Sequence, residues 1–166
     1  MTATVVHRRS GEGKAVEDAS GGLLVFKAGR ELGFDSLFFE MTVPPGHGAP
    51  PHTDPSEELF YVLEGEFEFV SDGGGGLSSR PLAVGDAVCV PRGAPHTFRN
   101  VGSGLGRMLV FFPENRQMEG FFDDISEPVA DAGSWTPGSR GQSSLERVAA
   151  ACERWGVGFA GPPPGG

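Results

Sequence analysis

The residues GDAVCVPRGAPHTFRN, numbers 85–100, are the strongest indication of the fold in this chain of 166 residues. One apolar run ends at Pro91, and a second run begins at His96. Between them, Pro91 and Gly93 have the backbone preferences that a tight bend requires. The positions that define the spacing are Gly85, Pro91, Gly93, His96 and Asn100, with five, one, two and three residues between them. The stretch is therefore typical of two short strands joined by a bend.

A second stretch with regular spacing, GHGAPPHTDPSEELFYVLEG, occupies residues 46–65. Its defining positions are Gly46, His52, Asp54, Glu58 and Gly65, with five, one, three and six residues between them. Because side chains alternate across a strand, His52 and Asp54 are expected on one face of their strand. Glu58 is expected to share a face with Phe60 and Val62 in the next strand. Gly65 then marks a turn.

Short strands dominate the chain from Gly22 to Pro113. The runs are GLLVFKAG, DSLFFEMTVPPG, EELFYVLEGEFEFV, PLAVGDAVCVPRG, HTFRNVGSG and GRMLVFFP. Closely spaced short strands separated by glycine and proline favour an antiparallel sandwich or barrel over βαβ units. In EFEF, residues 66–69, glutamate and phenylalanine alternate, which predicts one solvated and one buried face. The fold class is therefore all-β.

After Pro113 the apolar period becomes helical. One amphipathic helix is predicted from Met118, Phe121, Phe122 and Ile125, which share one face. A second is predicted to begin at a capping box of Ser143 and Glu146 and to end at Gly156. Its apolar face contains Leu145, Val148, Ala149, Cys152 and Trp155. We expect a loose arm or edge strand over residues 1–20, a β-barrel over 21–113, and a helical extension and tail over 114–166, with the helices packed outside the sheets.

Composition restricts the partners of this chain. A net charge of -9 and the lack of a basic run argue against nucleic acid or an anionic membrane surface. No apolar run reaches about 18 residues, so we expect a soluble, cytoplasmic protein. Cys89 and Cys152 are too few for a disulfide framework and are expected to be buried free thiols. A small molecule or another protein is therefore the expected partner.

The two spaced stretches resemble the two signature motifs of the cupin family. Residues 85–100 contain every fixed position of the second motif, whereas residues 46–65 depart from the first motif at one position, with Asp54 where the family has histidine. The resemblance implies a small β-barrel of two facing antiparallel sheets with an interior pocket. The segments GFFDDISEPV and ACERWGVGFAGPP make the chain similar to single-domain bacterial cupins related to quercetinase, a dioxygenase that opens flavonols.

The residue types at these positions are suited to a divalent metal. Folding the strands across a barrel would bring His52 and His96 together with Glu58 inside an apolar sleeve. Two imidazoles and one or two carboxylates leave open positions for water or substrate. We expect one divalent transition metal, Fe, Mn, Ni or Zn, held by His52, Asp54, Glu58 and His96.

Asp54 allows three interpretations, because a carboxylate reaches less far from the backbone than an imidazole nitrogen. Asp54 can be a direct oxygen ligand, which gives a site of two histidines and two carboxylates. It can instead orient His52 or a metal-bound water, which leaves a site of two histidines and Glu58. In the third interpretation the metal is lost, and the pocket either binds an organic ligand or uses Asp54 and Glu58 as acid and base.

The pocket wall is expected to be apolar and aromatic. Strand alternation assigns Phe60, Val62 and Phe98 to it, while four further candidates come from neighbouring strands. These candidates are Phe38, Met41, Leu109 and Phe111. His47 lies in a loop rich in glycine and proline, where the expected place is solvent or the pocket rim.

The resemblance implies a metal-dependent dioxygenase similar to quercetinase, acting on an aromatic or enolic molecule and forming a homodimer. In that reading Glu58 is the catalytic base, and Asp54 joins it at the metal. A polyketide-type cyclase or isomerase is the alternative, because it needs only a Lewis-acid metal and a carboxylate base. A binding protein without enzymatic activity is the second alternative. Oxygen uptake separates the first two readings, and metal content separates both from the third.

Overall fold

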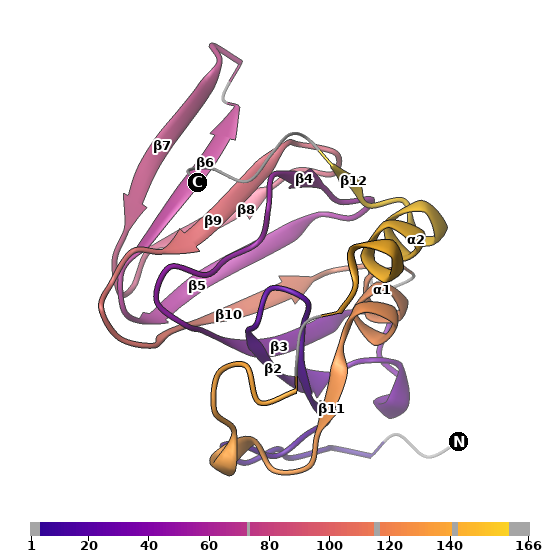
Figure 1. The fold of residues 1–166 in the computed structure, drawn as a ribbon. Helices are drawn as coiled ribbons and strands as arrows, with labels where there is room; N and C mark the ends of the chain where they lie inside the picture. Colours follow the sequence, from indigo (N-terminus) through magenta and orange to yellow (C-terminus); the bar gives the residue numbers. More distant parts are fainter. Residues whose placement is uncertain (1–3, 73, 115–116, 141–142, 160–166) are drawn as a thin grey trace.

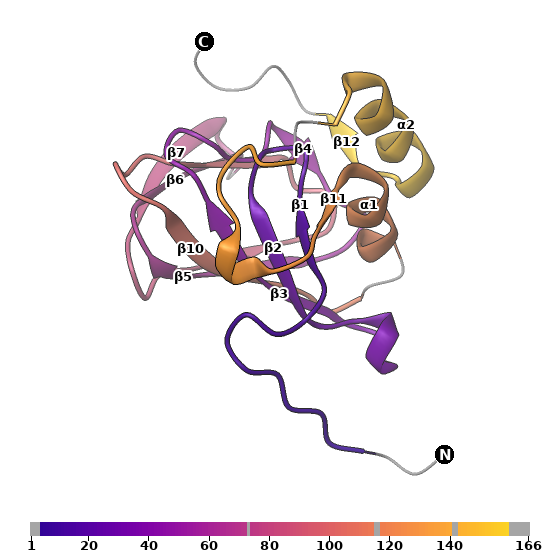
Figure 2. The ribbon, with the colours of Figure 1, turned by 60° about the horizontal axis from the view of Figure 1, so that its bottom comes forward.

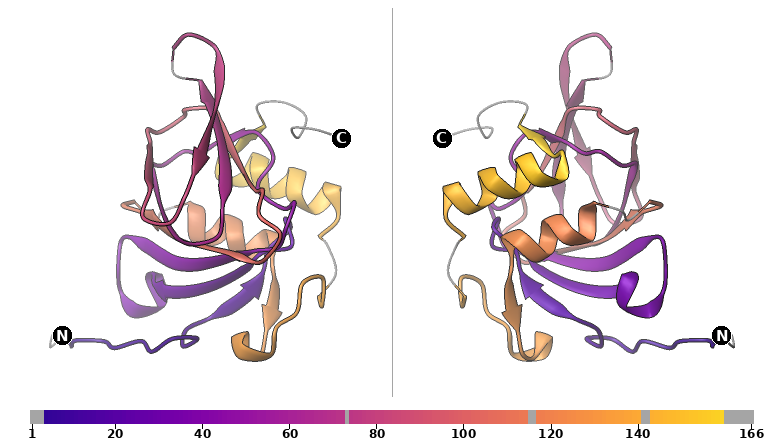
Figure 3. Two further views of the ribbon diagram at one scale, coloured as in Figure 1. Left: turned by 90° about the vertical axis from the view of Figure 1, so that its left-hand side faces the viewer. Right: turned by 90° about the vertical axis from the view of Figure 1, so that its right-hand side faces the viewer.

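The computed structural model describes residues 4–72, 74–114, 117–140 and 143–159. Within these residues the strands form two antiparallel sheets, one of seven strands and one of five, which lie one above the other (Figures 1 and 3). The all-β class and the two-sheet architecture predicted from the short apolar runs are therefore confirmed. No helix in this described part of the chain is long and apolar enough to cross a membrane.

The seven-stranded sheet contains the longest strands. Its order is β11 (Glu127–Val129), β1 (Ala15–Glu17), β2 (Leu23–Ala28), β3 (Leu37–Val43), β10 (Gly106–Phe112), β5 (Glu58–Glu64) and β8 (Ala87–Val90). Burial alternates along β3 and β10, so that every second side chain points into the interior. A 3₁₀ turn, Arg30–Leu32, joins β2 to β3, and another, Ala132–Ser134, follows β11.

The five-stranded sheet faces the central strands of the larger sheet. Its order is β12 (Gly158–Phe159), β4 (His52–Thr53), β9 (His96–Asn100), β6 (Phe67–Asp72) and β7 (Leu77–Leu82). The predicted alternation in β6 is confirmed, because Phe67 and Phe69 are buried and Glu68 is only half-buried. β12 is the last strand within the described residues, and it pairs with β4 so that Phe159 lies opposite His52.

Two helices lie together at one side of the two sheets, next to β12 (Figures 1 and 3). α1 (Met118–Ile125) forms as predicted, and its Phe122 ring lies 5.2 Å from Phe39 and 6.1 Å from Phe112. Phe39 and Phe112 both lie on the inner face of the seven-stranded sheet. The helix therefore packs against the inner face of that sheet rather than its outer surface, because its apolar stripe completes the core that the smaller sheet leaves open.

α2 (Leu145–Trp155) also forms, and Gly156 ends it as predicted, in the left-handed conformation at φ 78°. Its predicted apolar face is only partly buried, because Cys152 is buried whereas Leu145 and Ala149 are exposed. The predicted cap was wrong by one residue. The Ser144 side chain accepts the hydrogen bond from the Arg147 amide, whereas the Ser143 hydroxyl donates to the carbonyl of Ile125 at 2.7 Å. Ser143 thus ties the start of α2 to the end of α1.

The ends of the sheets differ from the predicted domain boundaries. Residues 15–17 are not part of a loose arm or an edge strand, since β1 pairs with both β2 and β11, as Figure 2 shows. The region after residue 113 is not purely helical, because β11 and β12 each join a sheet. Short strands of three and two residues have too little apolar pattern to be recognised in sequence, and their partners define them.

The two cysteines also differ in position. Cys152 is buried, as predicted, but Cys89 is exposed. Cys89 lies in β8 next to Val90, which is buried, and adjacent residues of a strand point to opposite faces. The apolar run around Cys89 therefore belongs to an edge strand with one solvent-facing side.

Candidate metal centre and its cavity

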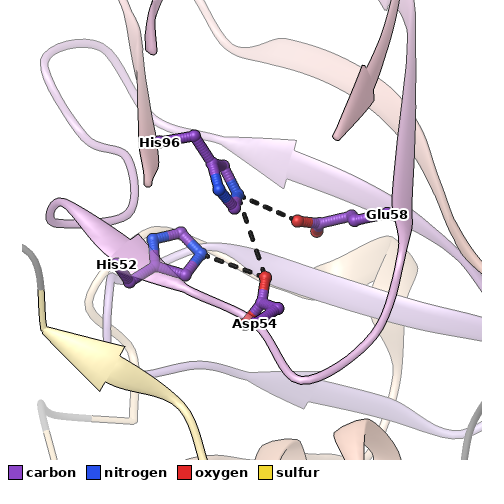
Figure 4. Close-up of side chains that lie close together, drawn as sticks. All are labelled: His52, Asp54, Glu58 and His96. Atoms are coloured by element: carbon purple, nitrogen blue, oxygen red, sulfur yellow. Dashed lines mark hydrogen bonds and ion pairs between the residues drawn. The ribbon is translucent and has the colours of Figure 1, made fainter. Parts of the chain in front are cut away.

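Four side chains from the two regularly spaced stretches converge at one point between the sheets (Figure 4). His52 comes from β4, His96 from β9 and Glu58 from the start of β5, while Asp54 lies in the link between β4 and β5. One ligand atom from each residue lies within 4.8 Å of the others. The pairing of β4 with β9 places His52 directly opposite His96, which brings the two imidazoles together.

The backbone orients both imidazoles. The Nδ1 atom of His52 lies 2.7 Å from the carbonyl oxygen of Pro50, and Nδ1 of His96 lies 3.0 Å from that of Ala94. A carbonyl oxygen can only accept, so each Nδ1 carries the hydrogen and donates it. The Nε2 atoms are left to face the cluster, as is usual for histidines that ligate a metal.

The cluster consists mainly of hydrogen-bond acceptors. Nε2 of His96 lies 3.0 Å from a Glu58 carboxylate oxygen and 3.8 Å from Asp54 Oδ2, and Nε2 of His52 lies 3.4 Å from Asp54 Oδ2. Both carboxylate oxygens of Asp54 are buried without a hydrogen-bond partner. Buried acceptors that face one another are costly unless a cation or a proton lies between them. The residues present therefore fit a divalent metal ion with mixed nitrogen and oxygen ligands.

The pKa shifts follow from burial and from mutual charge. Burial and the adjacent Asp54 carboxylate raise the pKa of Glu58 well above its usual value. Burial lowers the pKa of His96, and the neighbouring His52 lowers it further. Burial alone would lower the pKa of His52, but the Asp54 carboxylate outweighs it and raises that pKa. Burial alone would raise the pKa of Asp54, but His52 outweighs burial, and the pKa of Asp54 is therefore lowered.

Metal binding should release protons from this cluster. With a raised pKa, Glu58 in the metal-free protein keeps a proton at pH values above 4.5, where an ordinary glutamate has lost it. A metal needs the ionised carboxylate, so the affinity for Mn²⁺ or Zn²⁺ should increase as the pH rises through this range. Calorimetry in two buffers of different ionisation enthalpy measures the number of protons released. Glu58→Gln should release about one proton fewer per metal, and a metal affinity independent of pH would contradict the assignment.

The cluster opens into a cavity of about 540 Å³ between the two sheets and the helices. His52, Asp54 and Glu58 all contribute to its lining. Most of the wall is apolar, and its aromatic residues include Phe39, Phe60, Phe98, Phe112, Phe121 and Phe122. A cavity of this size and polarity is typical of sites for small organic molecules.

The predicted pocket residues fall into two groups, according to whether they lie on the strand face that points toward the cavity or on the opposite face. Phe60, Phe98 and Met41 line the cavity, and Val62 is buried on the same side of β5 without being among the lining residues. The other three, Phe38, Leu109 and Phe111, alternate with the buried positions of β3 and β10 and lie outside this wall. Phe38 and Phe111 instead form an edge-to-face pair with ring centroids 6.3 Å apart. The sequence did not determine which face of β3 and β10 these three residues occupy, and the structure places them on the face that points away from the cavity.

The structure also places His47 and Asp18 relative to the site. His47 is exposed, as predicted, and its Nδ1 contacts the carbonyl oxygen of Pro45. Asp18, for which no role was predicted, is buried and lines the same cavity as His52, Asp54 and Glu58. The segment Glu17–Gly22 is polar and rich in small residues, which is typical of an exposed turn, so only the tertiary structure reveals its position.

Residues 39–112 match the family model described as "Cupin domain". The chain therefore contains a cupin domain, and the resemblance inferred from the two spaced stretches is confirmed. These residues run from β3 through β10 and include all four side chains of the cluster.

Several enzymes are similar to this chain. Dimethylsulfoniopropionate lyase DddQ from Ruegeria pomeroyi is 39% identical over 66 residues, which are 39% of this chain and 31% of that lyase. A structure of oxalate oxidase is 27% identical with a TM-score of 0.51, covering 58% of this chain and 52% of the oxidase chain. The polyketide cyclase RemF from Streptomyces resistomycificus is 27% identical with a TM-score of 0.56, covering 69% of this chain and 82% of the cyclase chain. This chain thus spans about a third of the lyase and about half of the oxidase.

Proposed function

We propose that this chain is a metal-dependent cupin enzyme that acts on an aromatic or enolic small molecule, and that the reaction is a dioxygenation similar to that of quercetinase. One observation carries the proposal: a cluster of two histidines and two carboxylates opens directly into a cavity whose wall is largely apolar and contains several phenylalanines. The two enzyme neighbours with 27% identity support an enzymatic role, although their substrates differ from each other.

His52, Asp54, Glu58 and His96 would hold the metal, because their ligand atoms converge and because Asp54 has two buried oxygens without another partner. When bound, a divalent ion would supply Lewis-acid activation of a substrate with two vicinal oxygens and, if redox-active, a route for electrons to dioxygen. The chain's own contribution is to position the substrate and to move a proton.

Glu58 is the best-placed proton acceptor. Its carboxylate lies in the cluster and lines the cavity, so it can reach a substrate hydroxyl beside the metal position. The proton goes from the substrate oxygen to a Glu58 oxygen, which leaves an enolate in the cavity. Phe60 and Phe98 flank this point and exclude water from the anion.

A polyketide-type cyclisation or isomerisation is the second candidate. The similarity to RemF favours it, because that comparison covers the larger share of both chains. The same proton acceptor and the same cavity would serve, but dioxygen would not be consumed. A substrate that can both react with dioxygen and cyclise distinguishes the two readings by the product formed.

Metal content and oxygen uptake test the proposal together. We expect close to one transition metal per chain in protein purified without nickel resin or chelator, measured by elemental analysis. With a flavonol such as quercetin, the metal-loaded protein should consume dioxygen, recorded with an oxygen electrode, and chelator treatment should abolish uptake. Turnover of an enolic polyketide analogue without oxygen uptake would favour the cyclase. Protein that takes up none of Fe, Mn, Ni, Zn and Co would refute both readings.

A further inference from the structure

Asp18 is a buried carboxylic acid on the cavity wall that the proposed chemistry does not use. It lies in the turn between β1 and β2, and the residue is 7% exposed. Asp18 and the two residues that follow it line the same cavity as His52 and Glu58. A buried carboxyl group that faces an organic-ligand cavity is a candidate for recognition of the ligand.

One oxygen of Asp18 is fully engaged by its own turn. Oδ1 accepts hydrogen bonds from the Ser20 hydroxyl at 2.7 Å, from the Gly22 amide at 2.9 Å and from the Ser20 amide at 3.1 Å. These three donors hold the carboxyl group in one orientation. The adjacent Glu17 is engaged elsewhere, since it accepts from the Trp135 indole and the Ser139 hydroxyl.

The other oxygen of Asp18 is available to a ligand. Oδ2 forms no hydrogen bond with the described part of the chain, and it is not among the fully buried atoms that lack a partner. Its remaining access is therefore to the cavity that Asp18 lines. Burial also raises the pKa of Asp18, as expected for a carboxyl group removed from bulk water.

Asp18 and the metal cluster lie at different ends of the apolar wall. Strand register aligns Phe60, Val110 and Phe39 in one row, with Glu58 two residues before Phe60 and Met41 two residues after Phe39. Gly22 lies beside both Met41 and Asp18, since a Cβ atom added to Gly22 would be 3.3 Å from Met41 Cε and 3.4 Å from Asp18 Oδ1. Asp18 therefore adjoins Met41. A ligand that spans the phenylalanine wall can thus contact both ends.

We propose that Asp18 determines specificity by accepting a hydrogen bond at Oδ2 from a hydroxyl group on the end of the substrate remote from the metal. This inference rests on the proposed function, and it narrows the substrate class to planar enolic or phenolic molecules with a further hydroxyl group at a remote position. Asp18 touches the substrate but takes no part in the reaction at the metal.

Four synthetic flavonols serve as probes: 3-hydroxyflavones that carry either a hydroxyl or a methoxy group at C7 or at C4′. Each pair differs in its ability to donate a hydrogen bond at one remote end. The dissociation constant of each probe for the metal-loaded protein is measured by fluorescence titration. For one of the two pairs we expect the hydroxyl compound to bind at least about ten-fold more tightly, as for a hydrogen bond to a charged acceptor.

Asp18→Asn is the decisive variant, because its amide oxygen can still accept the three hydrogen bonds of the turn. Its NH₂ group would then take the position of Oδ2 and donate equally to a hydroxyl or a methoxy oxygen. The preference should therefore fall to within about two-fold of unity. Ser20→Ala weakens the turn without altering Oδ2 and should retain the preference.

The outcomes separate this inference from the proposed function. Equal affinities within both pairs for the wild-type protein, or an unchanged preference in Asp18→Asn, would overturn the role of Asp18 and leave the metal chemistry standing. If no probe binds the metal-loaded protein, the proposed function and this inference fail together.

Discussion

His96→Ala is expected to abolish metal retention and activity. The His96 ring is wholly enclosed between the sheets and presents Nε2 to Glu58 and Asp54, so its loss removes one of the two nitrogen ligands. Loss of even a supporting residue at such sites lowers metal affinity by about ten- to a hundred-fold, and loss of a direct ligand should cost more. Elemental analysis after dialysis against a weak chelator measures the effect.

Two controls isolate ligation from folding. His96→Gln keeps most of the side-chain volume beside Phe69, whose ring stacks on His96 at 5.7 Å, and it should remain folded with lost metal binding. His47→Ala removes an exposed histidine whose Nδ1 contacts a carbonyl two residues earlier, as in His96. It should leave metal content unchanged. Full metal occupancy in His96→Ala would show that the ligand assignment is wrong.

Asp54→His is expected to change which metal the site prefers. If Asp54 is a direct ligand, the neutral imidazole should still coordinate but remove one negative charge, which shifts preference from Mn²⁺ toward Ni²⁺. Asp54→Ala should then weaken both metals by at least about ten-fold. Affinities of the wild type and the two variants for Mn²⁺ and Ni²⁺, measured by competition with a chromogenic chelator, test this expectation.

The remaining outcomes correspond to the other interpretations of Asp54. Tighter binding of both metals by Asp54→His would mean that the new imidazole adds a ligand and that Asp54 had only oriented the site. Equal affinities in all three proteins would mean that Asp54 takes no part. The buried, unpartnered oxygens of Asp54 favour direct ligation, because a carboxylate without any other donor has the most to gain from a cation.

The ligand cluster could be predicted from the sequence because the direction of each ligand depends on residues close to it in the chain. Alternation within β4 and β5 and the bend before His96 set the direction of each ligand over only a few residues. Only the pairing of distant strands was then needed to bring them together, and the family resemblance implied that pairing. The helices were predicted for the same reason, since one apolar stripe in each is visible in a short window.

Features that depend on long-range packing were missed. The sides of β3 and β10 on which Phe38, Leu109 and Phe111 lie depend on strand register, and a shift of one residue reverses the face. The short strand β1 is defined by its neighbours rather than by its own three residues. Asp18 is buried only because the β1–β2 turn folds over the cavity, and no local pattern distinguishes it from a solvated turn.

The pairing of β12 with β4 has a consequence for the order of assembly. All four side chains of the cluster precede residue 100, but β12, which lies opposite His52, and α2, which lines the cavity, are synthesised after them. A nascent chain that stops after β10 would hold the ligands with one side of the cavity open to water. We therefore expect metal binding to become tight only after residues 145–159 have left the ribosome, so that cofactor loading follows the synthesis of these residues rather than that of the ligands themselves.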